Sequence, residues 1–185
     1  MMDYYFDTSS LVALARYYHP FDNTKGLYEF VKSKFVQKEI IVLDTILEET
    51  RFTSQGLALK AYPFIEEGKD LIINTRELMP FSTKKFDNML NNNFSVPALV
   101  KSIDPESYSV MKQQFLNSGD GKLILTMVNR LHDDKDADAC VVTEESRFGN
   151  DEKIFKKIPV LCDIVNAKCI TLVDYLSLTP FKVII

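Results

Sequence analysis

The sequence predicts an α/β fold with a central, mostly parallel β-sheet flanked by helices. Four short segments rich in β-branched, aromatic or other apolar residues have the composition of buried strands. Longer segments with apolar residues at helical spacing separate them. Strands that alternate with helices are typical of a parallel sheet covered on both faces. The four expected strands are residues 4–6, 39–43, 139–143 and 167–172.

Length and composition fit one globular domain spanning residues 1–185. The chain is 46% hydrophobic and 26% charged, and its net charge is −4. An acidic balance disfavours a simple electrostatic clamp for duplex nucleic acid. It leaves a nuclease open, because bound divalent cations offset negative charge locally.

The sequence also indicates a cytoplasmic location. Its first residues lack the basic start and apolar core of a signal peptide. No apolar run approaches the roughly 18 residues of a membrane span, so no membrane partner is expected. Three cysteines without a Cys-x-x-Cys motif do not predict a disulfide framework.

The first half of the chain begins with a buried strand that ends at Asp7. Residues 8–10 are hydroxyl-bearing and start a helix that 18–20 break. A second helix is expected over 27–35. After the next strand, Asp44 and Thr45 cap a third helix. A further helix is expected from residue 55 to 67, ending at Gly68.

The second half is interrupted at first and regular later. Residues 74–104 contain two prolines and an asparagine triplet, which predict short helices and loops forming an insertion or a flap over the site. A helix begins at Asp104 and runs to 116. Asp120 opens another helix that reaches Leu131. The last expected elements are a helix over 158–165, a strand over 167–172 and a short helix over 173–176.

Several acids follow the predicted strands or stand in the helices beside them. Ligand sites in parallel sheets form beyond the carboxyl ends of the strands. Carboxylates that converge there repel one another, and Mg²⁺ or Mn²⁺ relieves the repulsion with oxygen ligands. Glu49 is preferred over Glu48 because it lies three residues from Ile46, at the edge of the buried stripe. The candidates are Asp7, Glu48, Glu49, Asp120, Glu144 and Glu145.

Each acid also has a structural interpretation. Asp7 and Asp120 could cap the helices that follow them. Glu48 and Glu49 could belong to a solvated helix face, and the pair at 144–145 could be ordinary loop acids.

The order of these motifs resembles the PIN domain, in particular the PIN-like ribonucleases of the prokaryotic toxin group. The likeness rests on Asp-Thr-Ser at 7–9, Ile-Leu-Glu-Glu at 46–49, Gly-Asp at 119–120 and Val-Val-Thr-Glu-Glu at 141–145. It covers residues 3–50 and 117–176. It implies a three-layer sandwich and a Mg²⁺- or Mn²⁺-dependent endoribonuclease acting on single-stranded RNA. It also implies a toxin held by an antitoxin protein, and a homodimer.

By position, the resemblance assigns four catalytic and metal-holding acids: Asp7, Glu49, Asp120 and Glu145. It assigns supporting roles to Ser9 and Thr143, with Glu48 and Glu144 as alternates. Two departures stand out. Residue 145 is glutamate where the family usually has aspartate, and residues 132–139 are unusually acidic. Asp136 and Asp138 are therefore possible substitutes for Glu145.

Two other functions stay open. A phosphohydrolase could use Asp7 as a nucleophile and form an aspartyl-phosphate. Such enzymes carry a second aspartate two residues later, where this chain has Ser9. The third possibility is a non-catalytic PIN-like binding module.

Overall fold

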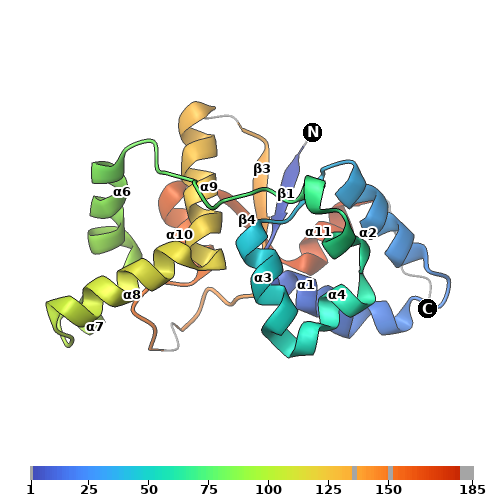
Figure 1. Cartoon of the computed structure of the whole chain (residues 1–185), viewed down its shortest axis with the longest axis horizontal. Helices are drawn as coiled ribbons and strands as arrows, with labels where there is room; N and C mark the ends of the chain where they lie inside the picture. Colours follow the sequence, from blue (N-terminus) through green and yellow to red (C-terminus); the bar gives the residue numbers. More distant parts are fainter. Residues whose placement is uncertain (1, 135–136, 150–151, 180–185) are drawn as a thin grey trace.

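A parallel β-sheet of four strands forms the centre of the part of the chain that the structure describes (Figure 1). The structure is a computed structural model, and it describes residues 2–134, 137–149 and 152–179. The strand order is β2-β1-β3-β4, and every pairing is parallel. The strands are β1 (Asp3–Phe6), β2 (Ile40–Ile41), β3 (Ala139–Val142) and β4 (Lys168–Ile170).

Helices cover both faces of the sheet, so the predicted α/β class is confirmed as a three-layer arrangement. In Figure 1, α9 and α10 lie on one side of the strands, and α2 and α11 lie on the other. No helix in the described ranges is long and apolar enough to cross a membrane. The α-helices are α1 (Thr8–Ala13), α2 (Gly26–Val36), α3 (Asp44–Phe52), α4 (Leu57–Ala61), α5 (Phe64–Glu67), α6 (Thr83–Met89), α7 (Pro97–Val100), α8 (Pro105–Asn117), α9 (Gly119–Asp133), α10 (Ile158–Val165) and α11 (Leu172–Leu178). Shorter 3₁₀ or π turns are η1 (Leu14–Tyr18), η2 (His19–Phe21), η3 (Thr53–Gly56), η4 (Lys69–Leu71) and η5 (Leu90–Phe94).

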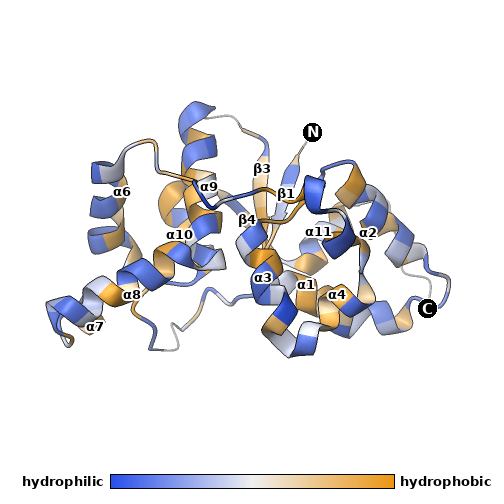
Figure 2. Cartoon of the chain, in the orientation of Figure 1, coloured by the Kyte–Doolittle hydropathy of each residue, from blue (hydrophilic) through white to orange (hydrophobic). Residues whose placement is uncertain are grey.

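The core forms where the strands meet these helices. All four residues of β3 are buried, as expected of an inner strand covered on both faces. Tyr4 and Phe6 of β1 both make edge-on ring contacts with Tyr175 of α11, because alternate residues of a strand share a face. Figure 2 shows β3 and α10 among the most apolar elements.

The strand order fixes where a ligand site can form. The chain moves from β1 to β2 on one side and then crosses to β3 on the other. Connections leave in opposite directions from neighbouring strands β1 and β3, which opens a crevice beyond their carboxyl ends. Phe6 pairs with Val142, so Asp7 and Thr143 leave the sheet at the same level.

The helix expected over residues 55–67 is wrong as a continuous element. Ser54, Gln55 and Gly56 all have left-handed backbone angles in η3, and α4 then ends at Ala61 before α5 begins at Phe64. Pro63 explains the second break, because proline disfavours the helical conformation of the residue before it. The predicted end of the helical segment before Gly68 is confirmed.

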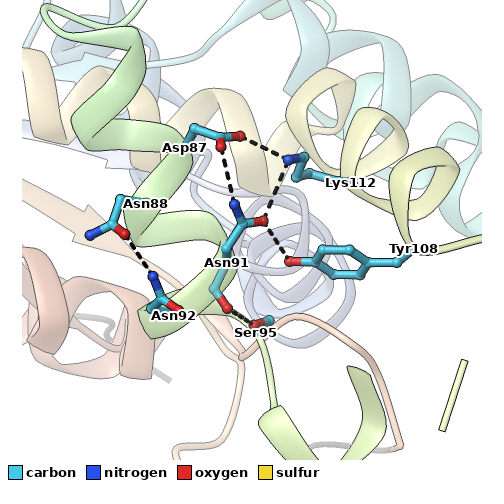
Figure 3. A network of polar contacts seen from close by, with 7 residues as sticks. All are labelled: Asp87, Asn88, Asn91, Asn92, Ser95, Tyr108 and Lys112. Carbon is cyan, nitrogen blue, oxygen red and sulfur yellow. Dashed lines mark hydrogen bonds and ion pairs between the residues drawn. The ribbon is translucent and has the colours of Figure 1, made fainter. Parts of the chain in front are cut away.

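Residues 74–104 form short helices and loops, as expected. A polar network holds α6 and η5 against α8 (Figure 3). Lys112 of α8 donates to Asp87 at 2.8 Å, Asn91 donates to the other Asp87 oxygen at 3.0 Å, and Tyr108 donates to Asn91 at 3.1 Å. The segment therefore packs beside α8.

Several element ends differ from the sequence-based expectation. Ser118, and not Asp120, caps α9, because its hydroxyl accepts the backbone N–H of Gly121 at 3.2 Å. Asp44 lies inside α3, which Leu43 precedes. The last strand is shorter than 167–172, because Thr171 already caps α11 through a capping box with Asp174.

Candidate acidic site

The four acids expected in the site line one hollow of about 530 Å³. It lies beyond the carboxyl ends of β1 and β3, at the crevice that the strand order opens. Asp7 follows β1, Glu49 belongs to α3, Asp120 to α9, and Glu145 to the segment after β3. Segments far apart in the chain therefore bring these carboxylates to one pocket, called the acid pocket below.

Asp7 is the most enclosed of the four, with 3% of its surface exposed. Its carboxylate caps α1 by accepting the Ser10 N–H at 2.7 Å. It also accepts the hydroxyls of Thr143 at 2.7 Å and Ser9 at 2.9 Å. Burial raises the pKa of Asp7 to about 6, and these three donors oppose that rise. The capping role and the site role thus coincide in one residue.

Ser9 and Thr143 connect Asp7 to the segment after β3. The Ser9 hydroxyl accepts the Glu144 N–H at 2.9 Å, and the Thr143 hydroxyl accepts the Glu145 N–H at 3.1 Å. Both hydroxyls therefore donate to Asp7 and accept from the next segment. The two hydroxyls thus hold the Asp7 carboxylate in place; a role in positioning a ligand or water stays a prediction from the resemblance.

Glu49 joins α3 to two other helices. One oxygen accepts the Thr8 hydroxyl at 2.9 Å, and the other accepts the N–H of Gly119, the first residue of α9, at 2.6 Å. A Cβ at residue 119 would collide with the Glu49 carboxylate and with Ile46. Glycine at 119 thus lets the Glu49 carboxylate keep this position, which any side chain at 119 would force to shift.

Glu144 and Glu145 likewise accept a hydrogen bond from the first backbone N–H group of two further helices. Glu145 accepts the N–H of Ile158 at 2.8 Å, and Glu144 accepts the N–H of Leu172 at 2.7 Å. These are the first residues of α10 and α11. Four helices, α1, α9, α10 and α11, consequently begin at a carboxylate of the pocket. Free N–H groups and the positive end of the helix dipole favour a negative charge there.

Asp120 differs from the other acids. Within the described part of the chain, its half-buried carboxylate has no hydrogen-bond donor. Its pKa is raised to about 7, first by burial and then by the carboxylates of Glu145, Asp7 and Glu49 in that order, while Lys153 opposes the rise. Asp120 is the acid whose charge the protein leaves least compensated.

The oxygen donors of the acid pocket suit a hard divalent cation. Among the described residues, no group of three His, Cys, Asp or Glu side chains is close enough to form a ready-made metal cage. Mg²⁺ usually takes one or two carboxylates and keeps waters or substrate phosphates for its other positions. Asp120 with one neighbouring carboxylate matches that smaller donor set.

The remaining candidates lie elsewhere. Glu48 is exposed, pairs with Arg51, and does not line the acid pocket. Asp138 precedes β3, at the opposite edge of the sheet, and its carboxylate is 3.6 Å from the ammonium of Lys168. Asp136 lies outside the described residues.

Three other residues that line the pocket were not expected from the sequence: Arg16, Tyr17 and Lys153. Arg16 is exposed and donates to the Ser54 hydroxyl at 2.7 Å. Helical spacing offered a signal for two of them, because Arg16 and Tyr17 lie about two turns beyond Ser9 on the same face. The acid pocket therefore has a basic and aromatic rim.

Fold and site together define an α/β protein with an acidic pocket at the switch point of a parallel sheet. The chain belongs to the family described as "Domain of unknown function (DUF4411)", whose model matches residues 4–183. Comparison with curated proteins gave no match, and comparison with solved structures gave none either.

Proposed function

We propose that the protein is a Mg²⁺- or Mn²⁺-dependent endoribonuclease that cleaves single-stranded RNA. The observation that carries this proposal is that Asp7, Glu49, Asp120 and Glu145, chosen from their order in the sequence, line one pocket. The resemblance of that order to the PIN domain supports the reaction type. The uncompensated charge of Asp120 supports a cationic ligand.

The residues of the acid pocket have different roles in the proposed reaction. Asp120 would hold the ion, with Glu145 or Glu49 beside it, since these carboxylates are among those that act on its charge. A bound divalent ion supplies positive charge to a phosphodiester and lowers the pKa of water. Ser9 and Thr143 fix Asp7 in place through their hydroxyls. Arg16 and Lys153 add positive charge at the rim, where an RNA phosphate would approach.

The test is cleavage of a fluorescent single-stranded RNA panel in Mg²⁺ or Mn²⁺. We expect cleavage by the wild type, none in EDTA, and a loss of about a hundredfold or more in Asp120→Asn. The matched control is Asp138→Asn, which removes an acid outside the pocket and is expected to retain activity. Cleavage that survives EDTA, or an active Asp120→Asn variant, would overturn the proposal.

The toxin role, the antitoxin partner and the homodimer rest on the resemblance alone. Co-expression with a protein encoded next to this one would test the first two. The expected result is a complex in which cleavage is suppressed.

A non-catalytic binding module is the second candidate, and the helix-capping contacts favour it. Glu49, Glu144 and Glu145 each hold a backbone N–H, so all three have structural roles independent of chemistry. A calorimetric titration without Mg²⁺ or Mn²⁺ binding, in folded protein without cleavage, would support this candidate.

The aspartyl-phosphate alternative has less support. Its nucleophile would be Asp7, which is 3% exposed and already accepts three donors. A nucleophile has to reach the phosphorus atom with a free oxygen lone pair.

A further inference from the structure

A second hollow, of about 470 Å³, lies next to the acid pocket and shares Glu49 with it. Lys122, Arg76, Asn117 and Thr45 line this second hollow, called the Lys122 hollow below. Like the acid pocket, it has two basic residues, but it has fewer acids: Asp44, Glu48 and Glu49.

Lys122 is buried, with 9% of its surface exposed. Within the described ranges, its ammonium has no hydrogen bond and no ion pair. Lys112 offers a contrast, since its ammonium lies 2.8 Å from Asp87 and 3.4 Å from Asn91 (Figure 3). The side chain is nine-tenths buried, but its ammonium reaches the hollow, since it is not one of the fully enclosed polar atoms without a partner in the described structure. An ammonium only donates hydrogen bonds, so its partner in the hollow has to be an acceptor. The position of Lys122 therefore points to an anionic ligand.

Other donors of the hollow also lack acceptors in the described structure. The Arg76 guanidinium has no partner there, and the buried Thr45 hydroxyl has none either. The ammonium of Lys122 and the guanidinium of Arg76 thus face the hollow without an acceptor in the described structure, whereas the Thr45 hydroxyl is enclosed by protein atoms.

The acids of the same hollow are already engaged. Asp44 accepts from the Thr75 hydroxyl and from the backbone of residue 45, and Glu48 pairs with Arg51. Glu49 accepts from Thr8 and Gly119. None of these carboxylates pairs with Lys122.

A third hollow, of about 320 Å³, continues from the second and shares Lys122, Arg76 and Asn117 with it. Its other walls include Leu78, Met79 and Phe86. An apolar hollow beside one that contains two cationic side chains fits a nucleotide, with the phosphate at the cations and the base among the apolar side chains. A base can enter such a hollow only when it is unstacked, which favours a single strand.

We propose that Lys122 and Arg76 bind a phosphate of single-stranded RNA, adjacent to the phosphate that is cleaved in the acid pocket. The anion site stands on its own observations, whereas the RNA strand as its source rests on the proposed nuclease function. Because the two hollows share Glu49, one strand can occupy both.

The test uses the full-length protein in EDTA, with two probes: inorganic phosphate and a short fluorescent single-stranded RNA. The variant is Lys122→Met, which keeps the length of the side chain and removes its charge. The matched control is Lys60→Met, at an exposed lysine of α4. We expect Lys122→Met to weaken RNA binding about tenfold, as loss of a charged hydrogen bond does. We also expect the slope of log K against log salt to fall by about 0.7, the value for one phosphate contact on a single strand.

Thermal unfolding separates binding from folding. The Lys122 ammonium has no protein partner in the described structure, so its removal is expected to leave the Tm of Lys122→Met close to that of the wild type. Phosphate is expected to raise the Tm of the wild type and of Lys60→Met, and not that of Lys122→Met. If Lys122→Met destabilises the fold, Arg76→Met, at an exposed residue, is expected to show the same binding defects.

The outcomes distinguish this inference from the nuclease proposal. Phosphate binding that depends on Lys122 in a protein that cleaves no RNA would support the anion site and defeat the nuclease. RNA cleavage with the same KM in the wild type, Lys122→Met and Arg76→Met would support the nuclease and overturn the anion site. Equal RNA affinity and salt slope in Lys122→Met, Arg76→Met and Lys60→Met would also overturn it.

Discussion

The acid pocket and the network around Asp87 are both clusters of polar side chains, but they differ in whether each charge has a partner within the chain. In the network, Asp87 meets Lys112 and Asn91, and Asn91 meets Tyr108, so every charge has a partner within the chain (Figure 3). In the acid pocket, Asp120 meets other carboxylates and no donor in the described structure. A cluster whose charges are all paired within the chain stabilises the packing of helices, whereas a cluster with an unpaired charge can bind a ligand.

The largest effect on stability is expected when Asp7 is substituted, because its carboxylate accepts three hydrogen bonds within the chain. Asp7→Ala removes the cap of α1 and leaves the buried Thr143 hydroxyl and Ser10 N–H without their acceptor. We expect a loss of about 3 kcal/mol in the free energy of unfolding at pH 5, below the folded pKa of about 6, and a smaller loss at pH 7, where ionisation of the buried carboxyl already costs stability. Urea denaturation measures it, with Asp138→Ala as an exposed control. A loss equal to that of the control would show that the hydrogen bonds of Asp7 do not stabilise the fold.

The second-largest effect is a gain in the free energy of unfolding, and it is expected when Asp120 is substituted. Its folded pKa of about 7 stands above the ordinary value of 3.8, so the folded state binds a proton more tightly than the unfolded state does. The stability of the wild type therefore falls as pH rises from about 4 to 7. Asp120→Asn lacks this dependence, and we expect it to exceed the wild type by about 2 kcal/mol at pH 8 and to match it near pH 4.

Urea denaturation across that pH range measures the difference between wild type and Asp120→Asn. A variant that is less stable than the wild type at pH 8 would mean that a partner compensates Asp120.

A smaller effect is expected from the ion itself. Mn²⁺ or Mg²⁺ at concentrations well above Kd stabilises the folded state, and we expect a gain of about 1 kcal/mol, or roughly 5 °C in Tm, at pH 8. Thermal unfolding with and without EDTA measures it. The gain should disappear in Asp120→Asn and persist in Asp87→Asn. An equal gain in both variants would place the ion outside the acid pocket.

The smallest effect is expected in the closed network. The Asp87 side chain is half exposed, and solvent screens its pair with Lys112. We expect Asp87→Ala and Lys112→Met each to lower the free energy of unfolding by less than about 1 kcal/mol, with a coupling of about 0.5 kcal/mol in the double variant. A coupling above that of a typical buried pair would show that the network is more important than its exposure indicates.

The sequence was sufficient for the parts of the site that depend on local pattern. Each strand is a short apolar run, and Asp7 and Glu145 were found because they follow such runs. The break at Pro63 was also predictable, since it needs only the restriction that proline imposes on Tyr62.

The remaining parts depend on contacts between distant segments. Glu49 meets the N–H of Gly119 across 70 residues, and no local pattern announces that a side chain in α3 completes the start of α9. Lys122 is a polar residue among the apolar residues of α9, and the sequence alone gives no reason to expect it to line a hollow. Only the tertiary structure reveals that its side chain is nine-tenths buried and lines a hollow, without a partner for its ammonium in the described ranges.

The carboxylates at the helix starts also have a consequence for biosynthesis. Their supporting contacts span 41 residues from Thr8 to Glu49, 70 from Glu49 to Gly119 and 136 from Asp7 to Thr143. Long-range contacts form only after the entropy of closing the intervening chain has been overcome. A nascent chain on the ribosome thus exposes Asp7 and Glu49 early, but it cannot complete the walls of the acid pocket before the segment from Thr143 to Lys153 has emerged. A ligand that needs all of these walls can therefore bind only after the chain beyond β3 has been synthesised.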